Sequence, residues 1–231
     1  MIAIIGAMEE ELEALLSEMN INKEIKRLGT VFYEGDFFGN DAVVVRSGIG
    51  KVNAAACTQF LIDNYSPEVI INTGVAGSLN PDVKIGDLVI SESAVHYDVD
   101  CTIFGYEKGQ VARIPVTYFR SDADWLKLAK TVAESGYCNG FGIHSGVVAS
   151  GDRFLTDANM KGLIAKEFNA LCVEMEGASI AQTAYINATP FLIIRAISDN
   201  ADVKADKEYA DSKEEVIKRG VKLILCMLGK N

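Results

Sequence analysis

The chain contains the stretch FLIIRAISD at residues 191–199. Its apolar side chains follow one another without the alternation of a half-exposed strand, which indicates a strand buried on both faces. The stretch ends on a polar pair, Ser198 and Asp199. In open α/β sheets ligands bind beside the carboxyl ends of the strands, so this aspartate lies where a binding site is expected.

The same unit recurs along the chain. A short β-branched run is followed by a loop of small or acidic residues and then by a helical pattern. The runs are Ile2–Ile5, Ala42–Val45, Val69–Ile71, Val147–Ala149, Leu171–Val173 and Phe191–Ile197. Strands that alternate with helices predict an α/β sheet covered by helices on both faces. No linker, repeat or low-complexity segment interrupts the pattern, so residues 1–231 are expected to form a single domain.

Composition limits the function. Of the 231 residues, 49% are hydrophobic, which is enough for a sizeable core. The apolar runs are too short to cross a bilayer, and the chain opens on a strand pattern without a basic flank, so neither a membrane span nor a secretory signal is expected. The net charge of −10 and the lack of a basic stripe argue against nucleic acid or a membrane surface as a partner.

Metal and disulfide chemistry are not expected either. The two histidines, His96 and His144, lie in separate segments without a second ligand at metal spacing. The five cysteines are scattered, odd in number and free of C-x-x-C spacing, which is typical of reduced thiols in a cytoplasmic protein. The sequence therefore predicts no metal and no cofactor.

Common glycine and serine motifs do not fit the chain. The segment SGIGK at residues 47–51 lacks the first glycine of a phosphate-binding loop, and Val52 stands where Ser or Thr should follow the lysine. The dinucleotide fingerprint also fails, because Asn53 occupies the third glycine position. No G-x-S-x-G elbow is present. Carboxylates at strand ends are the remaining candidates for chemistry.

The first of these carboxylate groups is the triplet Glu9-Glu10-Glu11, which opens a helix after the first strand. Acidic residues in a first turn ordinarily complement the helix dipole, an interaction of about 0.3–1 kcal/mol each. Helical spacing places Glu10 opposite the apolar face and puts Glu9 and Glu11 on its two shoulders. The pattern excludes Glu10 from a buried role and leaves the choice between the other two open.

Two further carboxylate groups end later strands. Glu174 and Glu176 flank Met175 directly after an apolar run, where ionised groups are rare without a partner or a chemical role. An ordinary helix N-terminus would also account for them. Asp199 could likewise cap a helix, although residues 201–204 do not continue as a strongly amphipathic one. Both groups stay open between a structural and a functional interpretation.

With these segments in view, the chain resembles the bacterial 5′-methylthioadenosine/S-adenosylhomocysteine nucleosidases of the nucleoside phosphorylase superfamily. The resemblance runs from residue 2 to about residue 202, in the family's order. The matching segments are Ile4–Glu11, Ser47–Ala55, Ile71–Gly74, Ala76-Gly77, Phe104–Tyr106, Ser150–Asp152, Val173–Glu176 and Arg195–Asp199. It implies a three-layer α/β/α fold around a central mixed, mostly parallel sheet. It also implies hydrolysis of a nucleoside in the cytoplasm, for methionine salvage, by a homodimer.

The resemblance assigns roles to the carboxylates. Glu11 falls on the family's general base, Asp199 on the acid that protonates adenine, and Glu176 on the residue that holds the ribose hydroxyls. The remaining residues that it places around the substrate are Met8, Ile49, Ala76, Gly77, Phe104, Phe154, Leu155, Met175, Ser198 and Tyr209. Phe104 is expected to reach into the pocket of the second subunit.

The resemblance places these residues on different sides of the expected substrate. Adenine is expected between Phe154 and the loop at residues 75–77, with the Leu155 backbone at its edge. Met8, Ile49 and Tyr209 are expected on the 5′ side of the sugar. Val75 departs from the serine that many members carry, and Tyr209 replaces the more usual phenylalanine.

Other functions stay open at this point. A purine nucleoside phosphorylase needs cations for phosphate, and Ile71 and Asn72 offer none where related phosphorylases place an arginine. A binding protein without catalysis would need no acid and base pair. A nucleosidase for another adenine nucleoside, such as aminofutalosine, fits the same residues. Sequence does not decide the preference among 5′-methylthioadenosine, S-adenosylhomocysteine and 5′-deoxyadenosine.

Overall fold

The centre of the molecule is one sheet whose strands form two parallel blocks. In this computed structural model, which describes residues 1–137 and 140–229, ten strands join in that sheet. The first block pairs β4 (Asn40–Arg46), β1 (Ile2–Gly6), β5 (Val69–Ser78) and β10 (Phe191–Asp199) in parallel. The second block pairs β6 (Leu88–His96), β8 (Ile143–Ser150) and β9 (Ala170–Glu174) in parallel.

The two blocks close on each other through antiparallel pairs. Ile194 of β10 lies opposite Ile90 of β6, and Gly77 of β5 lies opposite Val173 of β9. Because β10 also pairs with β5, the five strands β5, β9, β8, β6 and β10 form a closed ring. The predicted mixed sheet is confirmed, and its ring closure explains why so many strand ends meet at one place.

The remaining strands extend or edge this sheet. A hairpin of β2 (Asn20–Arg27) and β3 (Thr30–Phe37) adds to β4 in antiparallel pairs, and short β7 (Phe119–Arg120) pairs with β6. Most side chains of β2 are exposed, whereas those of β3 are all buried or partly buried. An outer strand with one open edge has no partner to bury it, which accounts for its polar sequence.

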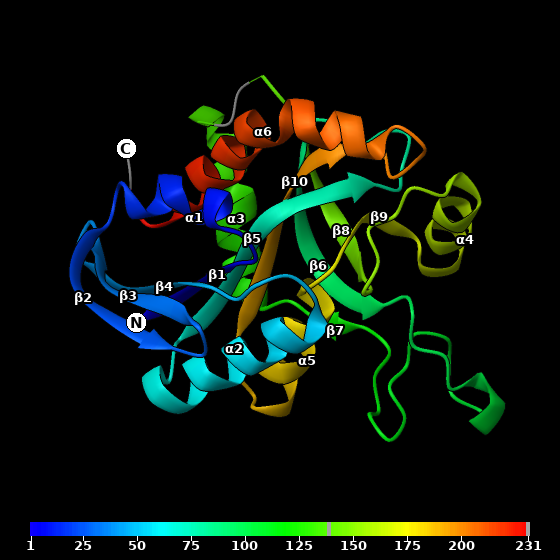
Figure 1. Cartoon of the computed structure of the whole chain (residues 1–231), viewed down its shortest axis with the longest axis horizontal. Coiled ribbons are helices and arrows are strands. Elements are labelled where there is room, and N and C mark those ends of the chain that lie inside the picture. Colours follow the sequence, from blue (N-terminus) through cyan, green and yellow to red (C-terminus); the bar gives the residue numbers. More distant parts are fainter. Residues whose placement is uncertain (138–139, 230–231) are drawn as a thin grey trace.

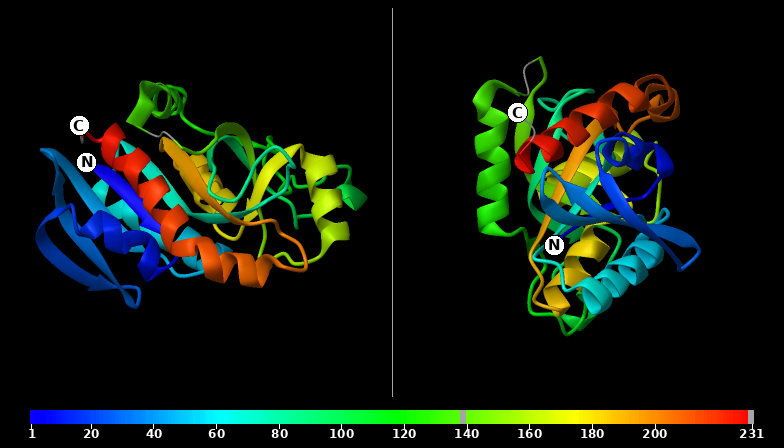
Figure 2. Two further views of the ribbon diagram at one scale, coloured as in Figure 1. Left: turned by 90° about the horizontal axis from the view of Figure 1, so that it is seen from above. Right: turned by 90° about the vertical axis from the view of Figure 1, so that its left-hand side faces the viewer.

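Helices cover both faces of the sheet, as predicted. One face carries α1 (Glu9–Leu16), α3 (Ala123–Val132) and the long α6 (Ala205–Met227), and the opposite face carries α2 (Lys51–Tyr65) and α5 (Gly177–Ile186) (Figure 1). The two turned views show α6 crossing the sheet beside α1 (Figure 2). Helix α4 (Ala158–Phe168) lies against β8 and β9. The short helices are η1 (Thr102–Phe104) and η2 (Ala133–Tyr137).

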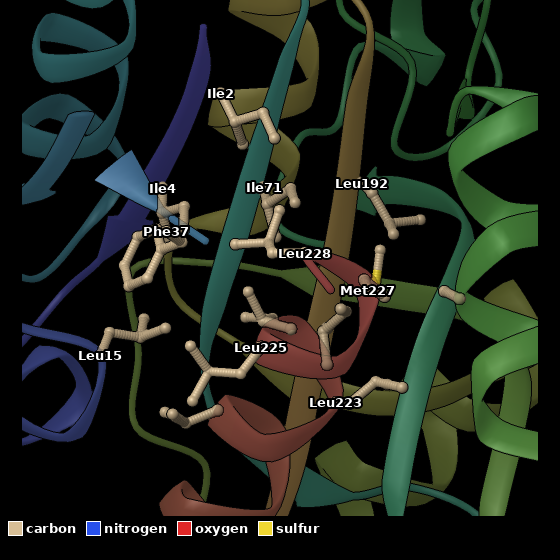
Figure 3. Close-up of a cluster of buried hydrophobic side chains, with 14 of the residues drawn as sticks. Ile2, Ile4, Leu15, Phe37, Ile71, Leu192, Leu223, Leu225, Met227 and Leu228 are labelled. Atoms are coloured by element: carbon tan, nitrogen blue, oxygen red, sulfur yellow. The ribbon is translucent and has the colours of Figure 1, made fainter. Parts of the chain in front are cut away.

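Strand β1 shows how the sheet builds a core on each face. Ile2 and Ile4 pack towards α1 and α6, whereas Ala3 and Ile5 pack towards α2 and α5. Figure 3 shows Ile2 and Ile4 in the buried cluster of the first face, which also includes Leu225 and Met227 of α6. Successive strand side chains point to opposite faces, and each fully buried isoleucine contributes about 1.5–3 kcal/mol of transfer free energy. The continuous apolar runs are therefore strands buried on both sides.

Small residues let α5 begin close to the sheet. The segment Gly177–Ala181 is buried throughout. A Cβ added to Gly177 would lie 3.0 Å from Ile193 Cδ1 and 3.1 Å from Glu174 Oε1, so a larger residue would push the helix away. The close approach brings the N-terminus of α5 onto Glu174, the carboxylate that ends β9. Within the described residues, no helix is long and apolar enough to cross a membrane.

Candidate active site

A cavity of about 410 Å³ opens at the carboxyl ends of β1, β5, β9 and β10. Its lining residues are Ala7, Met8, Glu11, Ile49, Val75, Ala76, Gly77, Phe154, Val173, Glu174, Met175, Glu176, Ser198, Asp199, Asp206 and Tyr209. Every site residue predicted from the sequence lines it except Leu155 and Phe104. A larger hollow of about 720 Å³ lies between α1 and the β2–β3 hairpin, away from the buried strand-end carboxylates. We therefore assign the site to the smaller cavity.

Glu11 is the buried member of the opening triplet. Glu11 is 2% exposed. By contrast, the side chain of Glu9 is 82% exposed, and its Oε2 lies 4.0 Å from Arg46 Nε. One Glu11 oxygen accepts hydrogen bonds from the N–H groups of Ala7 at 2.7 Å and Met8 at 3.0 Å, and the other from Val75 at 3.2 Å. The structural and chemical interpretations thus coincide, because the carboxylate that caps α1 also faces the cavity.

Burial changes the acidity of Glu11. Loss of hydration raises the pKa of its carboxyl, although Arg195 and the three backbone N–H donors oppose the rise. A Cβ on Gly74 would lie 2.6 Å from Glu11 Oε1 and would also collide with the Arg195 guanidinium. Only glycine at that position leaves room for both groups. A carboxylate with a raised pKa is a better base than one in water.

Asp199 lies at the end of β10 and is 3% exposed. Its Oδ1 accepts the Ala201 N–H at 2.8 Å, and its Oδ2 accepts the Ser198 hydroxyl at 2.9 Å. Burial raises the pKa of this carboxyl against the effect of those two donors. The side chain does not cap α6, which begins only at Ala205. Gly77 packs directly against it, since a Cβ there would lie 2.7 Å from Asp199 Oδ1.

Glu176 begins the turn before α5 and is 5% exposed. Its Oε1 accepts the Gly50 N–H at 2.8 Å, and its Oε2 lies 3.8 Å from Nη2 of Arg195. Burial and the neighbouring Glu174 raise the pKa of Glu176 to about 7, against the pull of Arg195 and Gly50. The group can therefore change its charge near neutral pH.

Glu174 has a different hydrogen-bonding environment from that of Glu176. It receives hydrogen bonds from the Ser150 hydroxyl, the Arg195 guanidinium and the N–H groups of Glu176 and Gly177, at 3.0 and 2.8 Å for the last two. Its side chain is only 2% exposed. A carboxylate with its oxygens occupied in this way holds the start of α5 and the guanidinium in place.

Arg195 was not foreseen as a functional residue. It is fully buried in the middle of β10, donates to Asn72 Oδ1 at 2.5 Å and also pairs with Glu174. A cation inside a nine-residue apolar strand was the available signal, because a buried charge requires partners. Those partners are Asn72 and the carboxylates that line the cavity, and the charge of Arg195 offsets part of the repulsion among these carboxylates.

Aromatic and thioether side chains close the outer part of the cavity. The rings of Phe154 and Tyr209 meet edge to face with centroids 6.0 Å apart, and the Tyr209 hydroxyl lies 3.3 Å from Met8 Sδ. Leu155 is 3% exposed and lines an adjoining hollow of about 30 Å³ behind Phe154. Flat apolar walls beside buried carboxylates suit an aromatic base attached to a polar sugar.

Phe104 lies outside the cavity of its own chain. It and Ile103 belong to η1 and are 78% and 87% exposed. Two large apolar side chains on one protruding turn are unusual for a free surface. They give this turn an exposed apolar surface outside the cavity of its own chain.

The mixed sheet and its acidic cavity define an enzyme class, and comparison with known proteins names it. The model of the phosphorylase superfamily matches residues 1–227. The 5′-methylthioadenosine/S-adenosylhomocysteine nucleosidase of Geobacillus thermodenitrificans is 43% identical over 227 residues, which is 98% of this chain and 95% of the relative. The chain belongs to this superfamily and, within it, to the family of 5′-methylthioadenosine/S-adenosylhomocysteine nucleosidases.

Solved structures agree with this assignment. The nucleosidase from Neisseria meningitidis in complex with methylthio-immucillin-A matches with a TM-score of 0.94 and 40% identity, covering 98% of this chain and 97% of that one. The native structure of a futalosine hydrolase from Helicobacter pylori matches with a TM-score of 0.92 and 33% identity, covering 98% and 96%. The predicted fold and family are thus confirmed.

Proposed function

We propose that this chain hydrolyses the N-glycosidic bond of 5′-methylthioadenosine and S-adenosylhomocysteine, and also of 5′-deoxyadenosine. The products are adenine and the 5-substituted ribose. The observation that carries the proposal is that Glu11, Glu176 and Asp199, all nearly excluded from water, line one cavity with flat apolar walls. The relatives are named for two of these substrates, 5′-methylthioadenosine and S-adenosylhomocysteine.

Each carboxylate has a separate task in this reaction. Glu11 takes a proton from the attacking water, whose oxygen forms the new bond to C1′. Asp199 gives its proton to N7 of adenine, so that the electrons of the breaking C1′–N9 bond settle on a neutral purine. Glu176 holds the ribose hydroxyls and, as an anion, stabilises the positive charge that develops on the sugar. Inverting glycosidases divide the work between two carboxyl groups in a comparable way.

The residues around these carboxylates would hold the substrate in place. Phe154 and the segment at residues 75–77 would enclose adenine, with Leu155 and Ser198 at its edge. Met175 would pack on the sugar. Met8, Ile49 and Tyr209 would contact the 5′ substituent, for which the Tyr209 hydroxyl beside Met8 Sδ supplies a mixed polar and apolar wall.

Water rather than phosphate is the proposed nucleophile. Among the described residues that line the cavity, none is lysine or arginine. The guanidinium of Arg195 lies behind them and is occupied by Asn72 and Glu174. Phosphate would therefore enter a group of carboxylates without a free cation to bind it.

We expect adenine release from 5′-methylthioadenosine to proceed at the same rate in phosphate-free buffer and in buffer with added phosphate. The physical reason is that the attacking group comes from solvent and is activated by Glu11. Liquid chromatography of the products measures both adenine and the sugar. A rate that depends on phosphate, with a ribose 1-phosphate product, would make the chain a phosphorylase instead.

Aminofutalosine is the second candidate substrate. The observation that favours it is the close structural match to the futalosine hydrolase of Helicobacter pylori. The same adenine and ribose contacts would serve it, and only the 5′ substituent differs. Measuring kcat/KM for each adenine nucleoside under identical conditions ranks the candidates.

We further propose a cytoplasmic homodimer that works in methionine salvage and in recycling the by-products of S-adenosylmethionine. Four cysteines that the structure describes, Cys57, Cys101, Cys172 and Cys226, are free thiols, in line with a reducing compartment. Cys138 lies outside the described residues. The exposed Ile103 and Phe104 supply apolar contacts for a second subunit.

A dimer mass is expected from light scattering at micromolar concentration. Phe104→Ala is expected to raise KM several-fold while the fold of the single chain, read by circular dichroism, stays unchanged. Ile103→Ala removes a similarly exposed apolar side chain from the same turn, but not the one proposed to enter the neighbouring pocket, so its KM should stay near the wild-type value. A fully active monomer, or a Phe104→Ala enzyme with wild-type KM, would contradict the proposed subunit contact.

A further inference from the structure

Three charged residues join three segments of the chain beside the cavity. Lys51 begins α2, Asp98 follows β6, and Asp152 follows β8. The Lys51 ammonium lies 2.6 Å from Asp98 Oδ1, and the Asp152 N–H donates to Asp98 Oδ2 at 3.1 Å. The Lys51 N–H in turn donates to Asp152 Oδ1 at 2.9 Å. The three residues thus form a closed ring of hydrogen bonds, here called the loop ring.

The loop ring supplies a helix cap that α2 lacks. The N-cap residue of α2 is Gly50, which has no side chain to accept the first N–H groups of the helix. Asp152 provides that acceptor from another loop, and its negative charge lies at the positive end of the helix dipole. The pair of Lys51 and Asp98 is partly shielded, with side chains 19% and 31% exposed. It is consequently screened less than an open surface pair.

The loop ring is linked to the site through Gly50. Gly50 precedes Lys51, and its own N–H donates to Glu176 Oε1 at 2.8 Å. Gly50 has φ of 93°, a conformation that favours glycine, and a Cβ there would lie 3.1 Å from Asp152 Oδ1. The carboxylate of Asp152 therefore packs against the Gly50 backbone and fixes its direction. On the other loop, Phe154 lines the cavity two residues after Asp152.

We infer that Lys51, Asp98 and Asp152 are positioning residues that hold the Gly50 N–H on Glu176. Through this contact they fix the carboxylate proposed to bind the ribose hydroxyls, and they keep Phe154 at a set distance from it. None of the three lines the cavity, so they act through the loops rather than on the substrate. The inference rests on the proposed function, because it assigns a purpose to the position of Glu176.

The charge of Glu176 offers a direct readout of this contact. The groups that face it are Glu174 from β9, Arg195 from β10, Glu11 from α1 and the Gly50 N–H before α2. Burial raises the pKa of Glu176 to about 7, and the Gly50 donor opposes that rise. Loss of the donor favours the protonated form and raises the pKa further. If the anion is the active form, the acidic limb of kcat/KM then moves to higher pH.

The test compares Asp152→Ala with Asp152→Asn over a pH series with 5′-methylthioadenosine. Alanine removes the acceptor for the Lys51 N–H, so KM is expected to rise about tenfold, as for a lost hydrogen bond to a charged group. The acidic limb is expected to shift upward by several tenths of a pH unit. Asparagine keeps an oxygen acceptor and should restore most of the wild-type KM. Asp98→Asn, which weakens the Lys51 pair, should shift the limb in the same direction.

Asp122→Ala is the matched control. Asp122 caps α3 by accepting the N–H groups of Asp124 and Trp125, both at 3.1 Å, and it does not line the cavity. Its loss should lower Tm as a lost cap does, while the pH limb stays at the wild-type position. The comparison separates a general loss of stability from a change at Glu176.

Two outcomes would overturn the inference, and they are distinct. In the first, the wild type is active, and the Asp152→Ala and Asp98→Asn variants have a lower Tm but the wild-type acidic limb and KM. That outcome rejects the positioning role of the loop ring and leaves the proposed function intact. A wild-type chain that releases no adenine from any of the proposed substrates rejects the proposed function, and the role of the ring with it.

Discussion

Asp199→Asn is expected to lower kcat for 5′-methylthioadenosine by about 10²-fold or more, the minimum effect of removing a general acid. Asparagine preserves the shape of the side chain and can still accept the Ala201 N–H that Asp199 Oδ1 accepts at 2.8 Å. It cannot transfer a proton to the purine. The variant should therefore bind a non-hydrolysable adenine nucleoside with nearly the wild-type Kd, as measured by calorimetry.

Asp202→Asn provides the control for this loss. Asp202 lies three residues later on the same loop, accepts the Lys204 N–H at 2.9 Å and does not line the cavity. Its neutralisation should leave kcat close to normal. An Asp199→Asn enzyme that kept more than about a tenth of the wild-type rate would show that another group protonates the leaving purine.

The pH dependence of the wild type follows from the same carboxyl. Burial raises the pKa of Asp199, so the protonated form that a general acid needs extends to higher pH than in water. The rate of the chemical step should fall as the pH rises through that value. The group must also regain its proton in each cycle, from solvent, once adenine has left.

The parts of the fold that were predictable are those in which one local pattern decides. Continuous apolar runs located β1, the start of β5 and β10, because a strand buried on both faces is mostly apolar. The outer strand β2 was not predicted, since its polar sequence matches an exposed loop as well as an edge strand. Pairing between distant segments, such as Gly77 with Val173, leaves no mark on either segment alone.

The sequence likewise indicated where the candidate site residues lie, but not what surrounds each of them. The strand-end position identified Asp199 and the pair of Glu174 and Glu176, but their separate environments required the packing. Glu174 is occupied by four donors, whereas Glu176 faces the cavity with a single backbone donor. That difference arises from Ser150 and Arg195, which are distant in the sequence.

The loop ring could not be predicted from the sequence for the same reason. Lys51, Asp98 and Asp152 come from three loops, and each has an ordinary surface charge in its own segment. The segment at residues 47–51 does not match the phosphate-loop motif. One of its glycines, Gly50, nevertheless turns an N–H towards Glu176.

Glu11→Gln is expected to lower kcat, whereas Glu9→Gln is expected to lower only the stability of the fold. Helical spacing placed both residues on the shoulders of α1, and the resemblance alone selected Glu11. In the structure Glu11 is 2% exposed and receives three backbone N–H groups, whereas the side chain of Glu9 is 82% exposed. Glu11→Gln should lower kcat by about 10²-fold or more, the effect of a missing general base. Glu9→Gln should leave kcat near normal and cost about 0.3–1 kcal/mol of helix-dipole stabilisation.

Glutamine at position 11 also tests the capping role separately. Its amide oxygen can replace only one carboxylate oxygen, and its NH₂ group would face either the N–H of Val75 or those of Ala7 and Met8. The unfolding free energy should therefore fall as well, by about 1–3 kcal/mol for a buried unsatisfied donor. Kinetics at a temperature far below Tm separate the two effects, because a folded Glu11→Gln enzyme should still be slow. If it turns over at the wild-type rate, Glu11 is a cap only, and Glu176 becomes the group that activates water.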